Sequence, residues 1–135
     1  MNLEFHLRAA GAVQVALAAI HLLFPKRFAW KEELPRLSLL NRQIFLVHTF
    51  FICVVLVLFG SWSFFLAPDL LRPSPLSRPV VGGIAVFWLL RLFCQWFVYD
   101  PSLWRGDRRN TRIHWAATAV WIYLAAVYAT ASFAG

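Results

Sequence analysis

The sequence predicts an all-α integral membrane protein built as a four-helix bundle. Two observations predict this fold class. The 135-residue chain is 61% hydrophobic and 14% charged, whereas a soluble domain carries about a quarter charged residues. Its charges collect mostly in short stretches between four long apolar segments, and about 20 apolar residues suffice for a helix to cross a bilayer. The whole chain, residues 1–135, is expected to form a single transmembrane domain.

The four spans are placed by their apolar runs and by the residues that interrupt helices. Pro25, Pro68 and the Asp-Pro pair at 100–101 follow the first three runs, and proline lacks the N–H that a helix interior needs. The spans are therefore predicted at residues 5–24, 41–66, 79–99 and 111–133.

Two of the predicted spans begin at residues that commonly cap helices. Ser38 precedes the second span, and Asn110 or Thr111 opens the fourth. Their side-chain oxygens can accept the unpaired N–H groups of a first helical turn. We therefore expect these residues to act as N-caps.

The orientation of the bundle follows from the placement of lysine and arginine. Nine basic residues lie beside the first and third connections: Lys26, Arg27, Lys31, Arg36, Arg42, Arg105, Arg108, Arg109 and Arg112. Connections rich in Lys and Arg stay in the cytoplasm, so both termini are predicted on the non-cytoplasmic side. The net charge of +7 is thus interpreted as an orientation signal, with no nucleic-acid partner. A bacterial inner (plasma) membrane is the expected location.

A polar stripe interrupts the third apolar segment. Arg91, Gln95 and Tyr99 are spaced by four residues, so on a helix they lie along one side. A polar side chain that faces lipid is costly. We therefore expect the stripe to turn toward the interior of the bundle.

Histidines in the other spans lie in the same half of the bundle. His21 is late in the first span, His48 early in the second and His114 early in the fourth. In the predicted orientation all three lie near the cytoplasmic side. The sequence thus predicts a cytoplasm-facing polar pocket lined by His21, His48, Arg91, Gln95 and His114.

Arg91 lacks an obvious counter-ion. None of the six Asp and Glu residues lies inside a span at its depth, and a charge at the centre of a membrane helix costs about 2.5–3.5 kcal/mol on the mildest scale. Three solutions remain open. The side chain extends to Asp100 or the headgroups, it bonds Gln95 and backbone carbonyls, or it meets an anion that the sequence does not supply.

The histidines offer two kinds of cofactor site. His21, His48 and His114 are candidate ligands of a metal ion, since imidazole binds zinc, copper, iron and nickel. Two of them could instead ligate haem b, with Arg91 holding a propionate. No local metal-binding motif such as HExxH supports either hypothesis. Membrane histidines also commonly serve only to hydrogen-bond a neighbouring helix.

These residues lead to one functional hypothesis and two alternatives. The leading hypothesis is a membrane protein that binds a cofactor or an anionic, lipid- or quinone-like ligand, with a small membrane oxidoreductase as its enzymatic form. The first alternative is a non-catalytic subunit whose polar residues pack helices or dock a partner. The second is a small oligomeric transporter. Membrane lipids, further copies of the chain or a membrane partner subunit are the expected partners. The sequence leaves open whether the protein is catalytic and what the ligand is.

Overall fold

The protein is helical throughout the part of the chain that the structure describes. The structure is a computed structural model that describes residues 2–134; it is 86% helical and without strands in that range, which confirms the all-α prediction. In chain order the elements are α1 (Leu3–Ile20), η1 (His21–Leu23), α2 (Phe24–Arg27), α3 (Trp30–Glu33), η2 (Leu34–Arg36), α4 (Leu39–Phe65), α5 (Ala67–Leu71), α6 (Ser77–Phe93), η3 (Cys94–Val98), η4 (Pro101–Leu103) and α7 (Arg108–Phe133).

Four helical stretches among the described residues are long and apolar enough to cross a membrane. They are Leu3–Arg27, Leu39–Phe65, Ser77–Val98 and Arg108–Phe133. Each begins two or three residues before the predicted span. These helices indicate an integral membrane protein.

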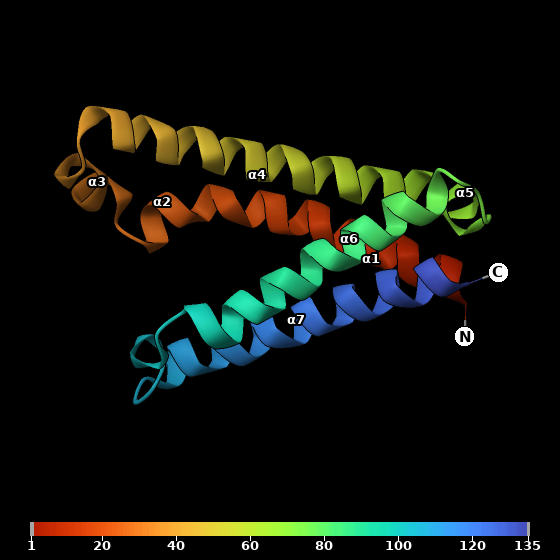
Figure 1. Cartoon of the computed structure of the whole chain (residues 1–135). Helices are drawn as coiled ribbons and strands as arrows, with labels where there is room; N and C mark the ends of the chain where they lie inside the picture. The colour runs from red at the N-terminus through yellow and green to blue at the C-terminus, as the bar shows by residue number, and fades with distance from the viewer. Residues whose placement is uncertain (1, 135) are drawn as a thin grey trace. The chain divides into compact units, whose positions relative to one another are not determined.

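The chain divides into two compact units. The α1–α4 unit comprises Arg8–Leu66, and the α6–α7 unit comprises the residues up to Leu7 together with those from Ala67 onward. Figure 1 shows α1 beside α4 in the first unit and α6 beside α7 in the second. Each unit is therefore built on a pair of long helices.

Two glycines bring the backbones of α1 and α4 together. A Cβ atom added to Gly11 would lie 2.5 Å from the carbonyl oxygen of Gly60, and one added to Gly60 would lie 2.7 Å from the carbonyl oxygen of Gly11. Small residues permit this close approach, which is common between membrane helices. Near the same end, the Arg8 guanidinium donates a hydrogen bond to the carbonyl oxygen of Phe64 in the last turn of α4, as expected for a cation at a helix C-terminus.

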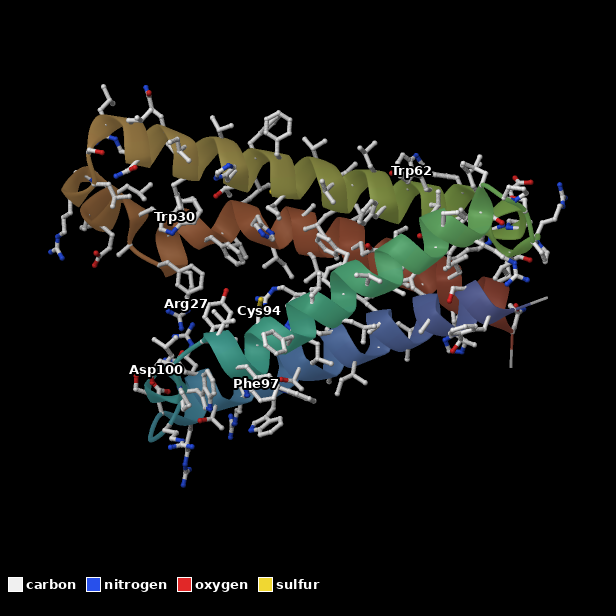
Figure 2. The ribbon with its side chains drawn as sticks, viewed as in Figure 1. Arg27, Trp30, Trp62, Cys94, Phe97 and Asp100 are labelled. Atoms are coloured by element: carbon white, nitrogen blue, oxygen red, sulfur yellow. The ribbon has the colours of Figure 1, made fainter. Side chains whose placement is uncertain are left out.

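The connection between α1 and α4 is a series of short helical turns. Ala29 adopts a left-handed conformation (φ 54°) between α2 and α3. Trp30, labelled in Figure 2, reaches from α3 to α4, where its ring meets Phe45 edge to face at 4.9 Å. Ser38 then caps α4 by accepting the N–H of Asn41 at 3.3 Å. This confirms the predicted N-cap.

In the α6–α7 unit, side chains close both ends of α7. Asp107 is the N-cap, because its carboxylate accepts the N–H of Asn110 at 3.1 Å. The prediction of Asn110 or Thr111 as the cap was wrong, because a carboxylate is available one turn earlier. At the other end, Arg78 donates to the carbonyl oxygens of Ser132 (3.1 Å) and Ala134 (3.3 Å).

The predicted third span is not a regular α-helix to its end. α6 is regular as far as Phe93, and the next five residues form the π-helix η3. The π-turn closes with the N–H of Tyr99 on the carbonyl oxygen of Cys94 at 3.2 Å. Tyr99 itself is in an extended conformation, so its predicted place in a helical stripe was wrong. Short π-helical turns inside α-helices frequently occur at functional sites.

The glycine contact predicts how substitutions affect stability. Alanine at Gly11 or Gly60 must push the two backbones apart, and overpacking of this kind costs about 1–3 kcal/mol. Thermal unfolding in detergent should therefore show a lower Tm for G11A and G60A. The matched control is Gly83→Ala, since a Cβ there meets no atom within 4 Å. Equal Tm values for all three variants would show that the close contact does not hold the unit together.

Candidate functional site

Arg91 lies against aromatic rings of the α6–α7 unit. Its guanidinium carbon is 4.8 Å from the centre of the Trp121 ring and 5.4 Å from that of Tyr99. Its Nη1 donates a hydrogen bond to Oε1 of Gln95 at 3.3 Å. The attraction of a cation to an aromatic face contributes about 0.5–2 kcal/mol, most where water is excluded. These contacts lower the cost of placing the charge in an apolar helix.

Gln95 is the centre of the hydrogen-bond network. Its Oε1 accepts from Arg91 and also from the indole N–H of Trp121 at 3.2 Å. Its Nε2 lies 2.9 Å from Nδ1 of His114. Because both donors converge on the oxygen, the amide nitrogen faces the imidazole and donates to it. The surrounding donors thus fix the orientation of the buried Gln95 amide.

His114 is buried and is the third member of the hydrogen-bonded chain Arg91–Gln95–His114. Its ring stacks on Trp104 with centroids 3.8 Å apart and planes 12° from parallel. Trp115 meets it edge to face at 5.0 Å. Since Nδ1 accepts the hydrogen bond from Gln95, the ring in this arrangement is neutral, with its proton on Nε2. We call Arg91, Gln95, Tyr99, Trp104, His114 and Trp121 the Arg91 network.

Further aromatic contacts hold this network between α6 and α7. Trp88 stacks on Trp121 at 5.2 Å with planes 13° apart. Trp96 donates its indole N–H to the hydroxyl of Thr118 at 3.3 Å. Aromatic pairs of this kind contribute about 0.5–1.5 kcal/mol beyond the area they bury. The network is therefore flanked by two further contacts between the third and fourth long helices, Trp88 with Trp121 and Trp96 with Thr118.

The π-helix positions two members of the network. Gln95 lies within η3, and Tyr99 follows directly after it. A helix that continued as α would keep Tyr99 in register with Arg91 and Gln95. The wider turn shifts this register, and the extended backbone of Tyr99 brings its ring back to Arg91.

Arg91 has no carboxylate partner among residues 2–134. Ion pairs that do form in this range include Arg36 with Glu33 and Arg72 with Asp69. Asp100, labelled in Figure 2, caps η4 by accepting the N–H of Ser102 at 2.8 Å. These hydrogen bonds to Ser102 hold the pKa of Asp100 below its ordinary value, and the charge of Arg105 adds to the effect. The sequence-based option of an Arg91–Asp100 pair is therefore not what the structure shows.

The Arg91 guanidinium has five N–H donors, and its hydrogen bond to Gln95 uses one of them. No buried side-chain nitrogen or oxygen in the described range lacks a hydrogen-bond partner. The remaining N–H groups of half-buried Arg91 are therefore open to their surroundings. A guanidinium edge of this kind matches the geometry of a carboxylate or phosphate.

The predicted site residues fall into both units. Arg91, Gln95 and His114 are joined by direct hydrogen bonds in the α6–α7 unit. His21 and His48 belong to the α1–α4 unit. His21 bonds within its own chain segment, with Nδ1 donating to the carbonyl oxygen of Leu17 at 2.7 Å, and His48 is exposed.

The metal hypothesis gains no support from the arrangement of the described side chains. In the range 2–134 no group of three or more His, Cys, Asp or Glu residues is placed to hold a metal ion. No structural feature supports haem either.

Sequence reasoning missed the aromatic members of the network. Trp121 follows His114 by seven residues, a spacing that places both on one face of a helix. That signal was available and identifies the ring beside Arg91. The stacking of Trp104 on His114 had no comparable signal, because Trp104 lies in the connection before α7.

No protein-family model, curated protein or solved structure matches this chain. Its four long helices among residues 2–134, each apolar enough to cross a membrane, indicate the class of integral membrane proteins.

The network predicts that tryptophans on α7 differ in their importance. Trp121→Leu removes a cation–π contact, a stacked pair and a hydrogen bond to Gln95, and should destabilise the protein by about 1–3 kcal/mol. Trp115→Leu is the control, because Trp115 is 59% exposed. Thermal unfolding in detergent should give a clearly larger Tm loss for W121L. A loss no greater than that of W115L would contradict this account of the network.

Proposed function

We propose that this membrane protein binds a ligand through an anionic group at Arg91. The observation that carries the proposal is the environment of the guanidinium. Its partners are aromatic rings and one amide oxygen, and no carboxylate among residues 2–134 pairs with it. A cation inside a membrane helix is costly without a counter-ion. An anion supplied by a ligand would remove that cost.

The depth of Arg91 favours a ligand that is itself soluble in the membrane. Arg91 lies seven residues before the end of the apolar stretch at Val98, which is about 10 Å along a helix. Its chain neighbours Leu90 and Phe93 expose apolar surface. A carboxylate or phosphate carried on an apolar body could reach this depth from within the bilayer. The proposed ligand class is therefore an anionic amphipath, such as a lipid with an acidic headgroup.

The Arg91 network gives each residue a distinct role in such binding. Arg91 would bind the anion with its N–H groups, and Gln95 would hold the guanidinium in place when no anion is bound. Trp121 would cover the cation on one side and leave the donor edge open. The proposal requires neither a metal nor haem.

We also propose that the basic connections face the cytoplasm and that both termini lie on the opposite side. The charge asymmetry of the loops supports this orientation, and an even number of spans places both ends on one side. A bacterial inner membrane is the proposed location.

The orientation is tested by the accessibility of single cysteines in intact cells. In a variant in which Cys53 and Cys94 are replaced by serine, a cysteine at Ser74 should react with a membrane-impermeant maleimide. A cysteine at Arg105 should react only after the cells are opened. The reverse pattern would contradict the proposed orientation.

The binding proposal is tested by substitution of Arg91. R91Q should weaken binding of phosphatidylglycerol by about tenfold or more, because a hydrogen bond to a charged group contributes about 1.5–3 kcal/mol. Binding is measured as the rise in Tm when phosphatidylglycerol replaces phosphatidylcholine in mixed micelles. The matched control is Arg112→Gln, which removes an exposed arginine near the start of α7 and corrects for general attraction to basic loops. Equal effects of R91Q and R112Q would overturn the proposal.

A second variant separates binding from packing. Q95E places a carboxylate where the amide oxygen now lies, 3.3 Å from Nη1 of Arg91. It should preserve or raise the Tm without lipid and remove the response to phosphatidylglycerol, because Arg91 then has an internal counter-ion. A wild-type protein that shows no response to phosphatidylglycerol, together with a more stable Q95E, would instead indicate that Arg91 only packs helices.

A further inference from the structure

The Gln95 amide connects Arg91 to a group that can take up a proton. In the arrangement observed, the amide oxygen satisfies Arg91 and Trp121, and the amide nitrogen satisfies Nδ1 of His114. This pattern requires a neutral imidazole, since a protonated ring has donors on both nitrogens. Histidine is the side chain that ordinarily changes charge between about pH 5 and pH 8.

Neutral His114 needs a hydrogen-bond donor from Gln95, whereas protonated His114 would need an acceptor. The imidazolium Nδ1–H would face the amide N–H at the 2.9 Å distance now occupied by a hydrogen bond. Rotation of the amide by half a turn gives the imidazolium its oxygen as acceptor. The same rotation turns the amide nitrogen toward Arg91 and the Trp121 indole N–H, so that three donors meet with no acceptor among them. An anion is the partner that such a cluster lacks.

We propose that anion binding at Arg91 is coupled to protonation of His114 through rotation of the Gln95 amide, so that the site takes up an anion together with a proton. This inference rests on the proposed function of Arg91 and adds its regulation. In the neutral state the Gln95 oxygen occupies the place of the anion. In the protonated state the anion replaces that oxygen, and the positive charge of His114 adds to the attraction.

The surroundings of His114 support this assignment. Its contacts are with the uncharged residues Gln95, Trp104 and Trp115, so Arg91 is the nearest charge along the network. Other ionisable groups on the elements packed around it are Arg78, Arg91, Cys94 and Tyr99 on α6 and its continuation, Asp100, Arg105 and Asp107 in the connection, and Arg108, Arg109, Arg112, Tyr123 and Tyr128 on α7. Asp100 and Asp107 are engaged as helix caps.

The direction of the effect follows from linkage. Because protonation removes the acceptor that competes with the ligand, binding should strengthen as the pH falls. Coupling between two sites typically changes affinity by about 5–150-fold. We expect at least about a fivefold gain between about pH 8 and about pH 5.

The experiment measures anion affinity of the full-length protein at several pH values in that range. The probes are phosphatidylglycerol in phosphatidylcholine nanodiscs and, separately, sulfate in neutral detergent, because neither anion titrates in this range. The wild type should bind more tightly at the acidic end, and R91Q should bind weakly throughout. A response to phosphatidylglycerol alone would identify a lipid headgroup as the anion, and a response to both probes would identify a site open to free anions; either supports the coupling if it is pH-dependent.

Two variants assign the coupling to its residues. His114→Asn keeps an acceptor for the Gln95 amide and does not titrate, so its binding should be weak and independent of pH. Gln95→Leu keeps His114 but removes the connection, so the pH dependence of its binding should be clearly smaller than that of the wild type. The control is His6→Asn, because His6 lies in the same unit but bonds the hydroxyl of Tyr123; it should keep the wild-type profile.

The outcomes separate the two proposals. Wild-type binding that depends on Arg91 but not on pH would overturn the coupling and leave the anion site intact. A wild-type pH profile retained in H114N would also overturn the coupling. No Arg91-dependent binding at any pH would overturn both. The comparison of wild type with R91Q across pH decides the matter even if a His114 variant fails to fold.

Discussion

The placement of one guanidinium in an apolar helix is the constraint on which the α6–α7 unit depends. Arg91 is stabilised by the faces of Trp121 and Tyr99 and by a single amide oxygen. Each of these contacts is in turn supported by neighbouring residues. Gln95 is hydrogen-bonded to His114, His114 is stacked on Trp104, and Trp121 is stacked on Trp88. The charge thus organises residues from α6, η3, the connection and α7 into one network.

The two units use different means to join their long helices. In the α1–α4 unit, Gly11 and Gly60 let the two backbones approach closely. In the α6–α7 unit, large aromatic rings and polar groups fill the contact. Close backbone packing leaves no room for larger side chains at the first contact, whereas the second contact brings hydrogen-bonding side chains to a cation. The proposed binding function therefore rests on α6 and α7.

The all-helical structure and its four long apolar helices were predictable because the length and apolarity of a segment show whether it can cross a membrane as a helix. The Arg91–Gln95 pairing was predictable from helical spacing, and Ser38 from its position before an apolar run. Other features were not. The π-helix at Cys94–Val98 has no pattern in its residues that distinguishes it from an α-helix. The stacking of Trp104 on His114 depends on the path of a connection.

The most direct test of the central claim is native mass spectrometry of the protein extracted from its membrane in a mild, uncharged detergent. The account predicts an adduct on the wild-type chain whose mass identifies an anionic amphipath, and the loss of that adduct from R91Q. A wild-type protein that carries no adduct, or an R91Q variant that carries the same one, would contradict the claim that Arg91 binds the anionic group of a ligand.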